Sequence, residues 1–375
     1  MLDFKVKVPF FDAAQLYKAD KEVLDEVIQK VLNDGAYING AEVEQFASNL
    51  SDYLNINHVI PCGNGTDALC LALMALDLAK GDEVIVPTFN FIAAAEAVSH
   101  LGLKPVFADV CPEDFNITAK SIEDKITAKT KAIVVVHLFG AAADMQSITE
   151  LANKHQIFVI EDVAQALGSE YYGEKLGVFG TIGCTSFFPT KNLACFGDGG
   201  AVFTKDQTLA KKIKMLANHG QRKKYDHQYV GVNSRLDTLQ AAILCHQLKK
   251  LELNIERRIN LAQRYHLGLQ PLDIFLPVKK EYTKHSFNQY CILLKTSAER
   301  DKLSAYLQDH DIATMIYYSK PNHLQKAFSS LGYKIGDFPM AEDICSRVMA
   351  LPISNITFEQ QDYIIKQINS FFVNV

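Results

Sequence analysis

This sequence of 375 residues lacks several features that would narrow its function directly. None of its eight cysteines forms a C-x-x-C pair, so no zinc site is expected and the cysteines are predicted to be free, buried thiols. No apolar run reaches the roughly 18–20 residues that a membrane-spanning helix needs. The formal net charge of −5 gives no general attraction to nucleic acids or to anionic membranes. An anionic ligand would therefore have to be held by a local set of donors.

Export signals, internal repeats and low-complexity segments are missing as well. Residues 1–23 are charged and lack the apolar core of a signal peptide. Together with cysteines typical of a reducing compartment, this predicts a cytoplasmic protein that binds neither membranes nor nucleic acids. Hydrophobic residues make up 48% of the chain and charged residues 22%, which is typical of an ordinary globular protein.

The sequence does contain a regular alternation of short β-branched runs and helical stretches between about residues 56 and 205. The strand-like runs are HVIPCG, DEVIVP, KPVFADV, KAIVVVHLFG, IFVIEDV, CTSFFP and GAVFTK. Apolar runs separated by amphipathic helices predict an α/β fold whose mostly parallel sheet is covered by helices on both faces. Ligands of such folds bind at the carboxyl ends of the strands, so the loops that follow the strands are the candidate sites.

The chain is long enough for two hydrophobic cores, and the spacing of its predicted strands and helices changes near residue 250. Residues 20–35 and 235–253 are predicted helices. Beyond them, strand-like runs at 289–295, 313–319 and 348–353 lie further apart, with helices at 297–310 and 358–372. We therefore predict a large α/β domain at 1–250 and a smaller C-terminal α+β domain at 251–375.

The first candidate loop is CGNGTDAL, which leads from a strand into a helix. Gly63 and Gly65 allow close approach of the backbone, and Thr66 adds a hydroxyl to the free N–H groups of the helix start, which suits a phosphate. An ordinary tight turn is an equally good interpretation of this loop alone. It is not a Walker sequence, and the absence of a G-x-G-x-x-G motif disfavours nicotinamide binding.

The next two loops offer an aromatic ring and an acid. In VPTFNFIAAA, Phe89 and Phe91 alternate, so one can face a ligand while the other packs into the core. In IFVIEDVAQALG, Glu161 and Asp162 end a buried strand, and a carboxylate there can bind a cationic ring nitrogen. Asp162 could instead cap a helix that includes Gln165, or bind a ribose in a dinucleotide fold, although the glycine loop of such a fold is missing.

The fourth loop, SFFPTKNLACFGDGG, sets Lys191 among aromatic and small residues before a glycine-rich turn. A solvated surface lysine is the default interpretation. Desolvation by the surrounding phenylalanines would instead lower the pKa of the amine and make its nucleophilic form accessible, as in lysines that form Schiff bases. Ser186, five residues earlier, could bind a phosphate oxygen. Together the four loops supply what pyridoxal phosphate (PLP) requires: a phosphate cradle, a stacking ring, an acid for the ring nitrogen and a reactive lysine.

With these four loops, the sequence resembles the DegT/DnrJ/EryC1/StrS family of PLP-dependent nucleotide-sugar aminotransferases, which have the aspartate aminotransferase (fold type I) architecture. The resemblance is carried by YINGAEVEQF, GNGTDAL, GDEVIVPTFNFIA, IEDVAQALG, SFFPTKNLACFGDGG, VGVNSRLDTLQAAIL and YYSKPNHLQ. It implies that Lys191 is joined covalently to the cofactor and that Asp162 pairs with the pyridinium nitrogen. It also implies that Gln165 binds the phenolic oxygen, that Phe91 stacks on the ring, and that Gly65, Thr66 and Ser186 bind the phosphate.

The resemblance further implies a homodimer with shared active sites, in which Asn233 reaches the cofactor phosphate of the neighbouring subunit and Arg235 lies near the same interface. From the residues alone, NSRLDTLQ would pass for a helix start, and Arg235 could equally form a structural ion pair. His323 resembles a histidine that lines the sugar pocket in relatives. The usual Tyr-Pro of this loop is Tyr318-Ser319 here, which sets the loop apart from the family pattern.

The retained lysine favours transamination, because dehydratase relatives replace it with histidine. The expected donor is L-glutamate, and the expected acceptor is a UDP- or dTDP-linked keto-sugar, with a 3-keto group favoured over a 4-keto group, for surface polysaccharide synthesis. Two alternatives from other classes stay open: a PLP enzyme acting on free amino acids, and a PLP-binding regulator without catalysis.

Overall fold

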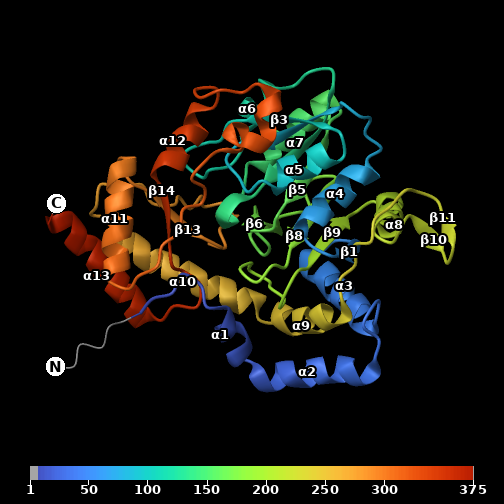
Figure 1. Ribbon diagram of the computed structural model, residues 1–375, viewed down its shortest axis with the longest axis horizontal. Coiled ribbons are helices and arrows are strands. Elements are labelled where there is room, and N and C mark those ends of the chain that lie inside the picture. The colour runs from blue at the N-terminus through green and yellow to red at the C-terminus, as the bar shows by residue number, and fades with distance from the viewer. Residues whose placement is uncertain (1–6, 375) are drawn as a thin grey trace.

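A computed structural model describes residues 7–374 and shows a central seven-stranded sheet in the order β1-β9-β8-β5-β4-β2-β3 (Figure 1). Strand β9 runs antiparallel to both of its neighbours, and all other adjacent pairs are parallel. The mostly parallel sheet and all seven predicted strands are therefore confirmed. The strands are β1 (His58–Cys62), β2 (Glu83–Pro87), β3 (Lys104–Ala108), β4 (Thr130–Val136), β5 (Phe158–Asp162), β8 (Ile182–Ser186) and β9 (Gly200–Thr204).

Helices cover both faces of this sheet, as its continuous apolar strands require. One face buries α4 (Gly65–Ala75), α5 (Ala93–His100) and α8 (Gln207–Leu216) in a single hydrophobic cluster. The opposite face packs α3 (Ala41–Leu54), α7 (Met145–His155) and α9 (Thr238–Leu248). The short α6 (Ala119–Glu123) packs against α7.

Two helix predictions had different outcomes. Helix α2 (Lys21–Asp34) ends at Gly35, which adopts the left-handed conformation (φ 68°) expected of a helix-terminating glycine. The helix predicted over 235–253 is confirmed over Thr238–Leu248 but does not run unbroken to 253, because α9 ends at Leu248 and α10 (Leu251–Leu269) follows. Lys250 N donates to Gln247 O, three residues back, so the helical pattern tightens and stops there. No glycine or proline marks this break.

The C-terminal part lies to one side of the sheet, whereas the β10–β11 hairpin (Gln221–Lys223 and Asp226–His227) projects on the other (Figure 1). Here β13 (Tyr290–Leu293) and β14 (Val348–Leu351) pair antiparallel beside three helices, α11 (Ser297–Asp309), α12 (Pro339–Arg347) and α13 (Phe358–Asn374). The strand predicted over 313–319 is wrong. Met315 forms an isolated bridge with Ala350, and the Tyr318 ring packs against Phe89 and Phe91 in the loop after β2 instead.

The remaining elements are small, and the division into domains stays a prediction. They are α1 (Ala13–Lys18) and a three-stranded sheet of β12 (Thr283–Lys284), β6 (Glu170–Tyr171) and β7 (Glu174–Lys175). The predicted boundary at residue 250 falls between α9 and α10. A separate buried cluster is built almost entirely from residues 261–371, together with Val8. Over residues 7–374, no helix has both the length and the apolarity needed to cross a bilayer.

Candidate functional site

The predicted site residues gather at the carboxyl ends of neighbouring strands. Asp162 is the last residue of β5 and Ser186 the last of β8, and these two strands pair in parallel. Gly65 opens α4 directly after β1, and Phe91 follows β2. The sheet topology therefore brings together four motifs that are far apart in the sequence, at the edge where α/β folds bind ligands.

Gly65 and Ser186 form the centre of a candidate phosphate cradle. A Cβ atom added at Gly65 would lie 2.6 Å from Ser186 Cβ, so only glycine allows this close approach. Asn64 caps α4 by accepting from Asp67 N at 2.8 Å. The first N–H groups of a helix have no partner within the helix and are available to an anion. Thr66, partly buried in this first turn, adds its hydroxyl.

Ser234 supports the cradle and was missed by the sequence analysis. Its Oγ accepts from Gly63 N at 2.9 Å and donates to Asp67 Oδ2 at 2.6 Å. It ties the loop that carries Asn233 to the turn at the start of α4. The neighbouring Asn233 is exposed, and Arg235 makes one long hydrogen bond, from Nη1 to Asn218 Oδ1 at 3.4 Å. Neither of the latter two contacts the cradle within this chain, so their predicted cofactor contacts stay predictions.

Lys191 and Asp162 are electrostatically coupled in a poorly hydrated environment. Desolvation lowers the pKa of Lys191, and the negative charge of Asp162 partly offsets this effect. Desolvation also raises the pKa of Asp162, which is 8% exposed, against the effects of the Ala164 N–H at 2.9 Å and the Lys191 charge. Lys191 is thus not a solvated surface lysine, and its amine is shifted towards the nucleophilic form.

Glu161 has a different role from its neighbour Asp162, although both end the same strand. Its carboxylate, fully buried, accepts from three backbone N–H groups at 2.6–2.8 Å, those of Gly177, Phe179 and Gly180. His137 Nε2 lies 3.1 Å away on the same oxygen as Gly177. Since Ala143 N donates to His137 Nδ1, the ring proton is on Nε2 and points at Glu161. The carboxylate therefore holds the backbone of Gly177, Phe179 and Gly180 in place, and we call this structural arrangement the clamp.

We expect Glu161→Gln to destabilise the protein by about 2–4 kcal/mol, because one acceptor oxygen becomes an NH2 group that faces backbone donors. Urea-induced unfolding, followed by circular dichroism, measures this loss. Glu150→Gln is the control, because Glu150 accepts a surface hydrogen bond from Gln146 in α7 and its change should cost little. Equal stability of Glu161→Gln and the native protein would contradict the clamp.

Aromatic side chains line one side of the candidate site. Phe89 is 1% exposed and Phe91 is 55% exposed, so the predicted alternation of inward and outward rings is confirmed. The Tyr318 ring lies 6.0 Å from that of Phe89 and 6.3 Å from that of Phe91. Gln165, in the loop that follows Asp162, is hydrogen-bonded to two of the segments that carry aromatic residues. Its Oε1 accepts from Phe139 N at 2.8 Å and its Nε2 donates to Tyr318 OH at 3.0 Å. Its side chain is oriented before any ligand binds.

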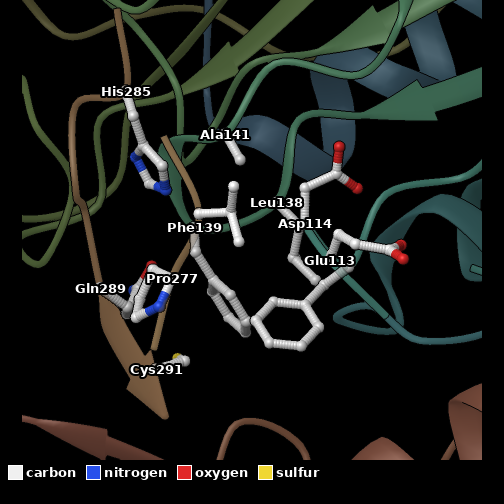
Figure 2. Close-up of a pocket in the computed structure, with 11 residues that line it drawn as sticks. Glu113, Asp114, Leu138, Phe139, Ala141, Pro277, His285, Gln289 and Cys291 are labelled. Carbon is white, nitrogen blue, oxygen red and sulfur yellow. The ribbon is translucent and has the colours of Figure 1, made fainter. Parts of the chain in front are cut away.

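Phe139 also lines a pocket that contains none of the predicted site residues (Figure 2). His285 and Gln289 lie on one side of this pocket and Asp114 on the other. Lys280 Nζ bonds Asp114 Oδ2 at 2.5 Å, which neutralises the carboxylate. The candidate site is therefore the strand-end cluster around Lys191 and not this pocket.

His323 occupies an interior position. It is 2% exposed, and its Nδ1 lies 2.8 Å from Thr88 Oγ1 while its Nε2 lies 3.1 Å from Glu342 Oε1. Both ring nitrogens are engaged within the protein. The predicted contact with a sugar would require one of these bonds to break, and the geometry favours a structural role.

The donor set fits pyridoxal phosphate. The tight Gly65–Ser186 contact and the start of α4 offer donors for a phosphate, and Asp162 supplies a buried carboxylate. Phe91 presents an exposed ring, and Lys191 presents a desolvated amine. These groups match, in type and in place, the requirements of an aldehyde-bearing phosphorylated ring.

Comparisons with known proteins agree with this chemistry. The family model of the DegT/DnrJ/EryC1/StrS aminotransferase family matches residues 18–369. The chain is 40% identical to the pleiotropic regulatory protein of Geobacillus stearothermophilus, over 98% of this chain and 99% of that one. It is also 40% identical to the UDP-2-acetamido-2-deoxy-3-oxo-D-glucuronate aminotransferase of Pseudomonas aeruginosa, over 92% of this chain and 95% of that one.

A solved structure extends the likeness to three dimensions. NtdA from Bacillus subtilis with bound cofactor PMP has a TM-score of 0.92 at 34% identity, and the match covers 99% of this chain and 86% of that one. Together with the mostly parallel sheet, this likeness confirms the predicted fold type I architecture.

Proposed function

Since the chain belongs to the DegT/DnrJ/EryC1/StrS aminotransferase family, we propose that it uses PLP to move an amino group from L-glutamate to a keto group of a nucleotide-linked hexose. The observation that carries this proposal is the desolvated Lys191 coupled to the buried Asp162, beside the Gly65–Ser186 cradle. Bound PLP supplies an aldehyde that bonds to amines and a ring that accepts electrons. The protein supplies binding, orientation and proton transfer.

Each protein group has a defined task in this proposal. Asp162 holds a proton on the ring nitrogen through a charge-assisted hydrogen bond. Gly65, Thr66 and Ser186 hold the phosphate, while Gln165 and Phe91 orient the ring. Lys191 would anchor the cofactor, and its free Nζ would take and return the proton at the reacting carbon as general base and acid.

The acceptor is a UDP- or dTDP-linked 3-keto sugar destined for surface polysaccharide. The relative from Pseudomonas aeruginosa, whose name specifies a 3-oxo UDP-sugar, supports the 3-keto preference. The active enzyme is a homodimer. Exposed apolar side chains near the segment that carries Asn233 support this state. Val230 is 93% exposed, and Tyr37 (50%) and Ile38 (47%) lie beside Asp237 and Thr238, which is an apolar surface typical of an interface.

One relative supports a second candidate, a regulator that binds the cofactor without turnover, because the Geobacillus protein is named a regulatory protein. Lys191 alone does not separate the two candidates, because both would use its amine to anchor the cofactor. Turnover separates them, since only an aminotransferase moves a proton at a substrate carbon.

The decisive assay gives the PLP-loaded protein L-glutamate together with 3-keto or 4-keto sugars linked to UDP or dTDP. We expect 2-oxoglutarate and amino sugar in equal amounts, with a higher kcat/KM for the 3-keto sugars. Comparable turnover of free amino acids without a sugar would contradict the proposal. Cofactor binding without turnover of any sugar would favour the regulator.

A further inference from the structure

The residue that follows the reactive lysine is a buried asparagine whose side chain joins four parts of the chain. Asn192 is 8% exposed. Its Nδ2 donates to Leu167 O at 3.0 Å and to Ser286 Oγ at 2.9 Å. Its Oδ1 accepts from Arg258 Nη1 and, at 3.1 Å, from Asn288 Nδ2. Two donors and two lone pairs are thus all used inside the protein.

Arg258 is an unusual partner, because it is a buried cation. It is 8% exposed on α10, and its Nη2 donates to Ser354 Oγ at 3.2 Å. Burial alone lowers its pKa to about 10, with no opposing carboxylate in the part of the chain that the structure describes. A buried charge without a counter-ion is costly unless neutral oxygens bind it. The amide oxygen of Asn192 is one of those that do.

The same network holds the other side of Lys191. Asn288 Nδ2 also donates to Thr190 O at 3.2 Å. Polar groups from beyond residue 250 therefore form hydrogen bonds with the residues on both sides of Lys191, Thr190 and Asn192. Lys191 N itself donates to Phe188 O at 2.9 Å. Lys191, Asn192 and Arg258 line one common pocket.

We propose that Asn192, held by Arg258 and Asn288, is a positioning residue that fixes the backbone of Lys191 and so the placement of its Nζ relative to Asp162. The inference rests on the proposed reactive role of Lys191 and goes beyond it, because it makes the C-terminal part of the chain responsible for the placement of the amine. A displacement of about 1 Å at a reacting group can cost about a hundredfold in rate. Supporting residues prevent such a displacement when packing and hydrogen bonds fix their own side chains.

The first test uses the apo protein and needs no substrate. Cyanate modifies exposed amines, and mass spectrometry after digestion reports the rate at which Lys191 is modified. In Asn192→Ala we expect Lys191 to react about tenfold faster than in the native protein, because local opening exposes the amine. In the PLP-loaded protein the same variant should lose about a hundredfold in kcat, while KM for the sugar stays within about threefold.

Two further variants separate positioning from general damage. Asn192→Asp keeps the acceptor for Arg258 and should retain much more kcat than Asn192→Ala. Gln361→Ala is the matched control, since Gln361 is fully buried, accepts from Arg264 Nε at 3.0 Å and donates to Leu261 O at 2.6 Å, which is the same arginine–amide chemistry between α10 and α13. It should lower stability and leave the reaction of Lys191 with cyanate unchanged.

A folded Asn192→Ala that reacts with cyanate at the native rate and keeps native kcat would overturn the inference. If this variant does not fold, Arg258→Lys decides, because lysine cannot span both Asn192 and Ser354. Native labelling of Lys191 in that variant would then overturn the inference. Failure of the native protein to aminate any keto-sugar would overturn the proposed function alone, since the labelling result does not depend on turnover.

Discussion

Replacing Lys191 by alanine should remove the visible absorbance that the lysine–cofactor linkage gives the protein and lower kcat by a factor of about a thousand or more. The amine has two tasks in the proposed reaction, anchoring the cofactor and moving a proton, and proton transfer by a positioned side chain alone contributes about 10²–10⁴-fold. Its surroundings prepare it for both, because desolvation lowers its pKa while the charge of Asp162 limits that shift. Absorbance spectra and single-turnover kinetics with L-glutamate measure the two losses separately.

The matched control is Lys212→Ala. Lys212 is 9% exposed on α8, and its ammonium forms a salt bridge of 2.5 Å with Asp77. Its loss should lower stability without changing the absorbance of the cofactor. If Lys191→Ala instead kept native activity, Lys191 would not be the reactive amine and the proposed function would lose its main support.

Much of the site could be predicted because parallel strands carry a local signature. A run of buried β-branched residues ends where its strand ends, so Asp162 could be placed at the carboxyl edge from the sequence alone. The glycine turn before α4 and the phenylalanines after β2 follow from the same reasoning. Composition around Lys191 also predicted its desolvation, which the structure confirms.

The parts that could not be predicted depend on contacts between distant residues. Ser234 meets Gly63 and Asp67 across more than 160 residues of sequence, and Arg258 meets Asn192 across 66. No periodicity encodes such pairs. The tyrosines of 313–319 suggest a strand because aromatic residues favour strands, whereas in the structure the Tyr318 ring packs against Phe89 and Phe91 after β2. Glu161 and Asp162 are adjacent acids of one type, and only the fold separates a structural clamp from a candidate catalytic group.

Asp162→Asn should lower kcat by about 10²–10³-fold without destabilising the apo protein. Asparagine preserves the shape and the acceptor for Ala164 N, but it removes the charge that would keep a proton on the ring nitrogen. Since burial raises the pKa of Asp162, the ionised carboxylate costs stability at every pH above its ordinary titration range, and the cost is largest above its raised pKa. The melting temperature of the apo variant at pH 8 should therefore equal or exceed that of the native protein, and this advantage should vanish in acid.

The same variant changes the titration of Lys191 in a defined direction. The negative charge of Asp162 raises the pKa of Lys191, so its removal should lower that pKa further, and cyanate should modify Lys191 at a lower pH than in the native apo protein. Asp114→Asn is the control, because Asp114 is also 8% exposed but pairs with Lys280 outside the site, and its change should cost stability and spare kcat. Replacing a functional acid that is buried at a cost to stability should lower kcat without lowering stability. Replacing a structural acid should lower stability and spare kcat. If Asp162→Asn kept kcat within about threefold and lost stability instead, Asp162 would belong to the structural class.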